Sequence, residues 1–132
     1  MFSLSESLSP QLVEVPSHSR EKVLARFHEI RKTTLDLTRP LSGEDCMVAA
    51  TSQTCPPKWH LAHTTWFFEQ FLLRQWEAGF SYFNPTFNHL FNSYYQSQGA
   101  FLSKKDRFLL SRPSMDEVRD YRALIDEKIT RM

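Results

Sequence analysis

The segment CPPKWHLAHTTWFFEQFLLRQW, residues 55–76, decides how this chain folds. Its paired prolines suit the first turn of a helix, where the amide hydrogens that proline lacks would have no intrahelical partner. Apolar spacing predicts a helix from Pro57 to about Ala78, with Gly79 as a left-handed residue behind it. Its apolar surface covers more than half of the circumference, which favours packing on several neighbours. The predicted stripes are Ala62, Trp66, Glu69, Leu73 and Trp76, and beside them Trp59, His63, Phe67 and Gln70.

Two more amphipathic helices are predicted on either side of this segment. The first covers residues 19–37, capped by Ser17 or Ser19 and ended by Pro40. The last covers residues 114–132 and begins with a capping box of Ser114 and Glu117. The predicted inner face of the first helix holds Val23, Phe27, Ile30, Thr34 and Leu37, and that of the last holds Met115, Val118, Tyr121 or Arg122, Ile125, Ile129 and Met132.

The two connections between these helices differ in length. Ser42 and Asp45 form a shorter capping box that predicts one or two helical turns. Residues 80–113 are rich in aromatics yet interrupted by Asn, Ser, Gly and Pro, which predicts a long ordered crossover with a short helix within NHLFNSYYQS, residues 88–97. Loops of this length in a compact domain are usually functional lids or binding loops.

The chain is expected to be all-α, with about three helices of a bundle that calls for a fourth. At 132 residues it fits one domain, here residues 19–132, after a flexible leader of residues 1–18. The fourth helix is expected from a longer parent chain or from another subunit, so the domain is predicted to be incomplete at its C-terminus.

Charge and composition argue against several classes of partner. The formal net charge of +1 offers no strong field for nucleic acid or for an anionic membrane surface. The N-terminal residues have neither the basic nor the apolar region of a signal peptide, and no apolar run approaches the roughly 18 residues that span a bilayer. Only 2 cysteines are present, too few for a disulfide-stapled secreted domain. A soluble, cytoplasmic protein is the expectation.

His60 and His63 are the first candidates for chemistry. At positions i and i+3 of the predicted helix they project from roughly the same side, as two metal ligands must. The spacing alone is weak, because a catalytic metal site normally needs at least three protein ligands. His28 and His89 are further imidazoles, but nothing in their local sequence orders them toward His63.

Other reactive side chains have simpler interpretations. Cys46 and Cys55 are spaced too far apart for a metal-binding pair and are expected to be small buried residues. Glu69 is a second carboxylate or base, or more simply a partner for Arg74 or a cap for a neighbouring element. The basic cluster at residues 104–107 is expected to be a solvated loop face, with anion recognition as the minor alternative.

Four longer motifs carry a family resemblance. PPKWHLAHTTWFFEQFLL (residues 56–73) resembles the N-terminal, DinB-like domain of EgtB, the hercynine oxygenase or sulfoxide synthase of ergothioneine biosynthesis. LSGEDCMV (41–48), FNSYYQSQG (91–99) and LLSRPSMDEVRDYRALID (109–126) resemble it too, in the family's order and spacing. Together they cover nearly everything after Ser19.

The resemblance implies a DinB-like four-helix bundle joined to a C-terminal domain of the formylglycine-generating-enzyme type. It also implies a non-haem iron(II) site that uses oxygen to join a cysteine-containing thiol, cysteine or glutamyl-cysteine, to hercynine. The family's first iron ligand corresponds to His63, whereas His60 is not a family ligand. The other two come from an HxxxH pair on the fourth helix, which this sequence lacks.

By this resemblance the chain alone is expected to be inactive, poorly stable and a weak binder of iron. Two alternatives remain. One is a non-catalytic DinB-like helical module that forms a homodimer or binds a protein partner through an exposed apolar groove. The other is a metal-dependent thiol transferase of the wider DinB-like kind, which needs further ligands.

Overall fold

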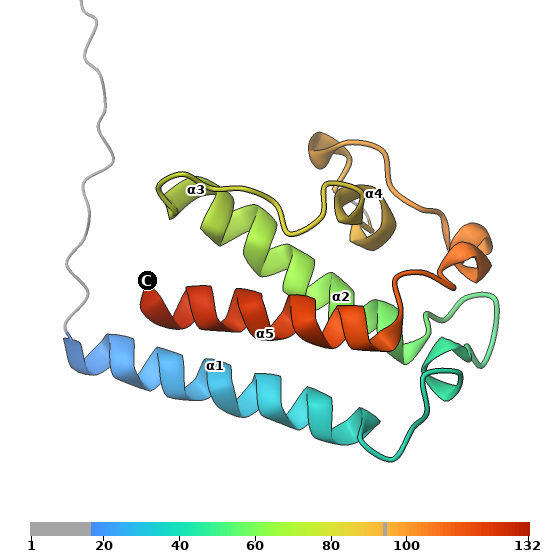
Figure 1. Ribbon diagram of the computed structural model, residues 1–132, viewed down its shortest axis with the longest axis horizontal. Helices are drawn as coiled ribbons and strands as arrows, with labels where there is room; N and C mark the ends of the chain where they lie inside the picture. Colours follow the sequence, from blue (N-terminus) through green and yellow to red (C-terminus); the bar gives the residue numbers. More distant parts are fainter. Residues whose placement is uncertain (1–16, 94) are drawn as a thin grey trace, which may run out of the picture.

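The computed structural model describes residues 17–93 and 95–132, and this part of the chain is helical without a strand (Figure 1). The all-α prediction is confirmed for it. The helices are α1 (Ser17–Thr38), α2 (Pro57–Phe68), α3 (Arg74–Trp76), α4 (Phe87–Phe91) and α5 (Met115–Arg131). Shorter helical turns are η1 (Asp45–Met47), the π-helical η2 (Glu69–Leu73), and the 3-10 turns η3 (Gln96–Gln98) and η4 (Lys104–Leu109).

The predicted leader lies outside the described residues, except that Ser17 and His18 already belong to α1. This helix therefore begins two residues before the predicted Ser19. None of the helices in residues 17–93 and 95–132 has the length and apolarity needed to cross a bilayer.

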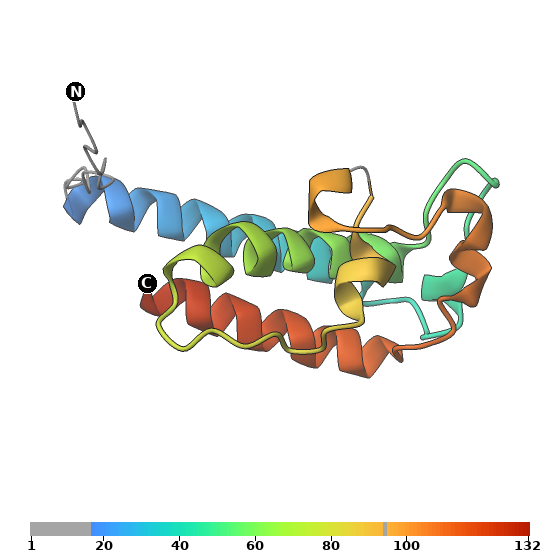
Figure 2. The same ribbon diagram turned by 90° about the horizontal axis from the view of Figure 1, so that it is seen from above.

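Three long helical elements run beside one another (Figures 1 and 2). α5 packs most extensively against α2, and α1 lies along both of them. The crossover returns from the end of α3 along α5 (Figure 2), and α4 then packs against α2. The predicted long crossover between the second and last major helices is therefore present, with a helix of 5 residues in its first half.

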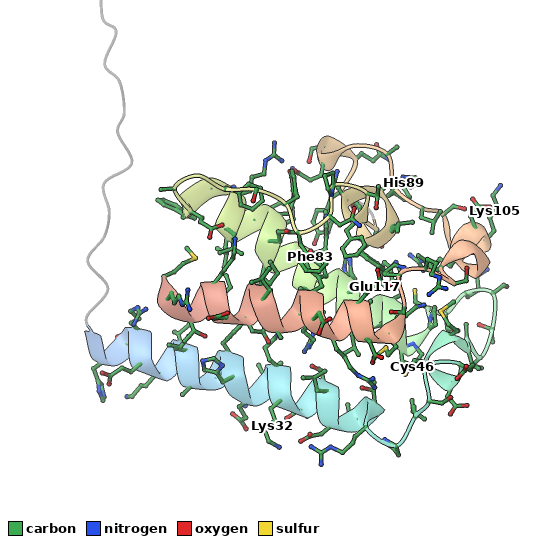
Figure 3. All side chains as sticks on the ribbon, viewed as in Figure 1. Lys32, Cys46, Phe83, His89, Lys105 and Glu117 are labelled. Carbon is green, nitrogen blue, oxygen red and sulfur yellow. The ribbon has the colours of Figure 1, made fainter. Side chains whose placement is uncertain are left out.

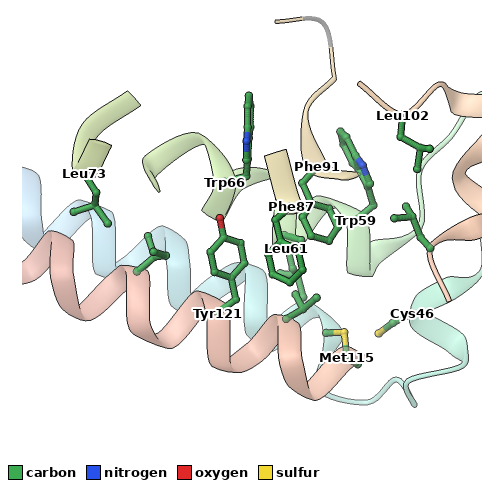
Figure 4. Close-up of a cluster of buried hydrophobic side chains, with 14 residues drawn as sticks. Cys46, Trp59, Leu61, Trp66, Leu73, Phe87, Phe91, Leu102, Met115 and Tyr121 are labelled. Atoms are coloured by element: carbon green, nitrogen blue, oxygen red, sulfur yellow. The ribbon is translucent and has the colours of Figure 1, made fainter. Parts of the chain in front are cut away.

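The hydrophobic core lies where α2, α4 and α5 meet (Figure 4). Tyr121 of α5 is fully buried, and its ring lies 5.0 Å from the rings of Phe83 and Phe87. Phe87 in turn packs edge-on against Phe91 at 5.0 Å. Phe87 and Phe91 of the crossover thus belong to the core, whereas Phe83 and Tyr95 are each 38% exposed.

The second predicted helix is continuous as far as Trp76 but changes its winding at η2. The predicted stripe is correct for Ala62, Trp66, Glu69 and Leu73, which are buried. It is wrong for Trp76, whose side chain is 53% exposed. A π-helical turn contains more residues than an α-helical one and therefore rotates the residues that follow it away from the stripe.

The inner face of α1 differs from the prediction. Val23, Ile30 and Leu37 are 69%, 47% and 72% exposed, whereas Arg31 is 4% exposed. The Arg31 guanidinium donates from Nε to Asp126 Oδ1 at 2.7 Å. Charge-assisted bonds to partners on other helices make this inward position favourable for a cation, so α1 is rotated relative to its apolar pattern.

Both predicted capping boxes are present. Ser114 Oγ accepts from the Glu117 amide at 3.2 Å, and Glu117 Oε2 accepts from the Ser114 amide at 2.7 Å. Ser42 and Asp45 exchange the equivalent pair of bonds at 2.9 and 3.0 Å before η1. Gly79 has a φ of 70°, the left-handed conformation predicted behind the second helix.

Glu69 fastens the crossover to the bundle. It is 1% exposed, and its Oε1 accepts from the Phe83 amide at 2.8 Å while Oε2 accepts from the Tyr121 hydroxyl. Arg74 donates instead to Gln98 Oε1 at 3.2 Å, so the predicted Glu69–Arg74 pair is wrong. Glu69 satisfies a backbone group of a neighbouring segment, as the capping alternative required.

Candidate functional site

An open cavity of about 680 Å³ lies between the start of α2, the loop before it, and the crossover. The indole side chains of Trp59 and Trp66 project from α2 away from α5 (Figure 4). The residues that line the cavity are Gln53, Thr54, Cys55, Trp59, His60, His63, Ser93, Tyr95 and Arg107.

The imidazole of His63 is held between two indole rings. Its ring stacks on Trp59 at a centroid distance of 4.4 Å and an interplanar angle of 10°. The Trp66 ring lies on a nearly parallel plane at 5.6 Å and 18°. These indoles are themselves fixed to the crossover, because Trp59 Nε1 donates to the Leu90 carbonyl at 3.1 Å and Trp66 Nε1 donates to Asn88 Oδ1 at 3.0 Å. The plane of the His63 ring is therefore set before any ligand binds.

A backbone contact assigns the tautomer of His63. Nδ1 lies 2.6 Å from the carbonyl oxygen of Phe91. A carbonyl oxygen only accepts, so Nδ1 must carry the hydrogen and Nε2 of the neutral ring keeps its lone pair. A metal-ligating histidine commonly has this arrangement, with the distal ring nitrogen donating to a carbonyl.

The surroundings of His63 also favour its neutral form. Burial lowers the pKa of the imidazole below the ordinary 6.5. The Phe91 carbonyl opposes this decrease, while the charges of His60 and Arg107 lower the pKa further. Neutral imidazole with a free nitrogen is the form that binds a transition metal.

His60 reaches the same cavity in a more exposed position. Its ring contacts Trp59 edge-on at 5.4 Å. Burial and the charge of Arg107 lower its pKa, while a hydrogen bond with the Cys55 backbone raises it. The structure thus brings both histidines of the WHLAH motif to one cavity but orients only His63 by stacking on both sides.

The other histidines lie elsewhere. His28 is exposed on α1, with Nε2 3.3 Å from Thr130 Oγ1, and His89 is exposed on the crossover, with Nδ1 3.0 Å from the Ala100 carbonyl (Figure 3). Neither lines the cavity. Within residues 17–93 and 95–132 no three His, Cys, Asp or Glu side chains are grouped as a metal site requires. The role of His63 as a ligand stays a prediction.

Arg107 corrects the prediction of a solvated basic cluster. Lys105 is exposed at the outer edge of η4 (Figure 3), but Arg107 is only 5% exposed. Its guanidinium lies 4.1 Å from the centroid of the Trp59 ring and donates from Nη1 to Cys55 Sγ. Stacking on an aromatic face explains how this cation is accommodated with little water around it.

The two cysteines have different environments. Cys46 is fully buried, as predicted, whereas Cys55 is only half-buried and lines the cavity. The sequence interpretation missed Cys55 and the Phe91 carbonyl as parts of the site, and for Arg107 it gave anion recognition only as the minor alternative. No local pattern marks them, because each reaches the cavity from a separate segment.

Comparison with known proteins leaves the family open. Neither a scan against protein-family models nor a search of curated proteins found a match to this chain.

Proposed function

We propose that this chain is the N-terminal iron-site domain of an EgtB-like enzyme of ergothioneine biosynthesis, with His63 as one imidazole ligand of a non-haem iron(II). The supporting observation is the bond from His63 Nδ1 to the Phe91 carbonyl, which leaves Nε2 unprotonated in a ring held beside an open cavity. Imidazole nitrogen is a suitable donor for iron(II). The remaining ligands are proposed to lie outside the described residues, as the family's HxxxH pair would.

Each residue around His63 has a proposed task. Trp59 and Trp66 fix the ring plane, and the Phe91 carbonyl keeps the hydrogen on Nδ1. Arg107 gives the cavity a cationic wall next to the space where a substrate would lie. When bound, iron(II) would supply the oxygen chemistry that joins a cysteine-containing thiol to hercynine.

Replacing His63 by glutamine is expected to weaken iron binding by about tenfold or more, whereas His60→Gln changes it little. The measurement is an anaerobic titration with iron(II) alone, followed by paramagnetic broadening of the histidine ring resonances. Because its pKa is lowered, neutral His63 persists as the pH falls to 6.5, and iron binding should persist with it. The wild-type affinity is expected to be weak, since one imidazole is a single ligand.

Two outcomes would contradict this proposal. Broadening of the ring resonances of His60 or the exposed His89 instead of those of His63 would show that the fixed tautomer does not determine which histidine binds iron. A tight site with one iron per chain would show that the ligand set is already complete in this chain.

A second candidate function is that of a non-catalytic helical module that pairs with a second copy of itself. The observation in its favour is the exposed apolar row of Val23, Ile30 and Leu37 on α1, at the seven-residue spacing of a helix-packing seam. An apolar cavity of about 370 Å³ adjoins the row between α1, α2 and α5, and Val23 lines it. A partner helix that covers this row would reach the cavity at Val23.

Sedimentation velocity tests this module. A compact dimer whose sedimentation does not change with concentration supports it, and Ile30→Glu is then expected to yield monomers. Leu124→Glu is the matched control, because Leu124 is 37% exposed and does not line that cavity. A wild-type monomer at all concentrations would exclude the dimeric module.

A further inference from the structure

The two cysteines differ in a way that the iron proposal does not use. Cys46 is 0% exposed in the core, while Cys55 is half-buried at the wall of the 680 Å³ cavity. A disulfide reagent of small size can reach a thiol in such a cavity but not one in a closed core. Cys55 is therefore the accessible thiol of the pair.

Arg107 gives this thiol a cationic neighbour in a fixed position. The side chain is only 5% exposed, and its guanidinium lies over the Trp59 ring at 4.1 Å from the centroid. Nη1 donates to Cys55 Sγ, so the sulfur acts as the acceptor. This bond holds the sulfur beside a fixed cation at the wall of the cavity.

The hydrogen bonding of Arg107 is incomplete. Its Nε is buried and has no hydrogen-bond partner among the described residues. Among the described residues, the side chains that line the cavity include the Arg107 guanidinium but no aspartate or glutamate. The cavity next to Cys55 is thus suited to an anionic molecule and disfavours a cationic one.

We propose that Cys55 is a site of thiol–disulfide exchange with small disulfides that carry carboxylates. The Cys55 thiol gives its proton to solvent, and Sγ attacks one sulfur of the disulfide. The sulfur–sulfur bond of the reagent breaks as the bond to Sγ forms, and the released thiolate takes up a proton. The disulfide is the only oxidant consumed, and the product is a mixed disulfide at Cys55.

This modification does not depend on iron. An adduct on Cys55 would occupy the cavity that His63 also lines. The exchange reaction can be measured on the chain without any metal. If Cys55 does not react, the iron proposal is unaffected. If iron does not bind, the proposal for Cys55 is unaffected.

The test compares two disulfides of opposite charge on the folded protein. Oxidised glutathione is the anionic reagent and cystamine the cationic one, and intact-mass spectrometry follows the adduct over time. Each rate is divided by the rate of N-acetylcysteine with the same reagent, which removes intrinsic reactivity. The normalised rate is expected to be about tenfold higher for glutathione disulfide than for cystamine.

Single variants locate the reaction. Cys46→Ser should form the same single adduct at the same rate, and Cys55→Ser should form none. Arg107→Gln is expected to remove most of the preference for the anionic reagent. Circular dichroism of this variant shows whether it is folded, and if it is not, raising the salt concentration on the wild type gives the same information, because screening should reduce the preference.

The proposal is overturned if Cys46 and Cys55 react at equal rates, since that pattern reports unfolding. Equal normalised rates for the two reagents would also overturn it, because Arg107 would then select nothing. An unreactive Cys55 in the folded protein would do the same.

Discussion

Replacing Arg122 by alanine is expected to destabilise the protein by about 3 kcal/mol, a large share of the roughly 5–15 kcal/mol of a typical domain. Arg122 of α5 is 1% exposed. Its Nη2 donates to the Arg31 carbonyl at 3.0 Å and to Thr34 Oγ1 on α1, and its Nη1 donates to the Leu61 carbonyl and to Thr64 Oγ1 on α2, both at 3.2 Å. One side chain thus joins three helices.

Burial has a cost that the variant would partly remove. Burial and the neighbouring charge of Arg31, opposed by Asp126, lower the pKa of Arg122 to about 10. The net loss of stability in Arg122→Ala therefore comes from the cavity left by the side chain and from the oxygen acceptors left without a donor. Methionine keeps most of the volume, so Arg122→Met is expected to lose less stability than Arg122→Ala.

Urea unfolding of these variants should be compared with Arg119→Ala. Arg119 lies on the same helix, but its side chain is 42% exposed and pairs with Asp116, which is 88% exposed. Exposed pairs contribute about 0–1 kcal/mol, so this control should unfold close to the wild type. If Arg119→Ala and Arg122→Ala lowered the free energy of unfolding equally, the buried hydrogen bonds of Arg122 would not stabilise the packing of the three helices.

Replacing Glu69 by alanine is expected to cost about 2–4 kcal/mol, because two buried donors lose their acceptor. The donors are the amide of Phe83 and the hydroxyl of Tyr121. Burial and the Glu69 carboxylate both raise the pKa of that hydroxyl, so it stays a donor throughout the working pH range. Glu77→Ala is the control, since Glu77 is partly exposed and pairs with Lys128 at 3.0 Å.

Glu69 also predicts the sign of a pH effect. Burial raises its pKa above the ordinary 4.5, against the opposing effects of the Phe83 amide, Tyr121 and Lys128. Between 4.5 and the raised value the folded state holds more protons than the unfolded state, so the contribution of Glu69 to stability falls as the pH rises through this window. Below the window Glu69 is protonated in both states and the contribution is constant.

The measurement is the difference in unfolding free energy between the wild type and Glu69→Gln across pH. Taking the difference cancels the pH dependence that other carboxyl groups contribute. Asp45 and Glu117 are examples, since their capping bonds lower their pKa values. A difference that does not change with pH, or one that grows in favour of the wild type as pH rises, contradicts the assigned shift.

The sequence predicted the features that depend on residues within one or two turns. The capping boxes at Ser42 and Ser114, the start of α2 at Pro57 and the left-handed Gly79 all follow from local backbone geometry. The placement of His60 and His63 on one side of a helix follows in the same way. For these features the interacting groups are neighbours in sequence, so the pattern contains the whole interaction.

The site depended on contacts that the pattern does not contain. The tautomer of His63 is set by a carbonyl 28 residues away, and Cys55 meets Arg107 across 52 residues. The orientation of α1 was decided by Arg31 and its partner Asp126, 95 residues apart, against the apolar pattern of the helix. Sequence alone determined which segments are helical and where they are capped, because those choices are made by local hydrogen bonds. Tertiary structure alone decided which face of α1 turns inward and which nitrogen of His63 is free, because burying a polar group requires partners that only the folded chain brings within reach.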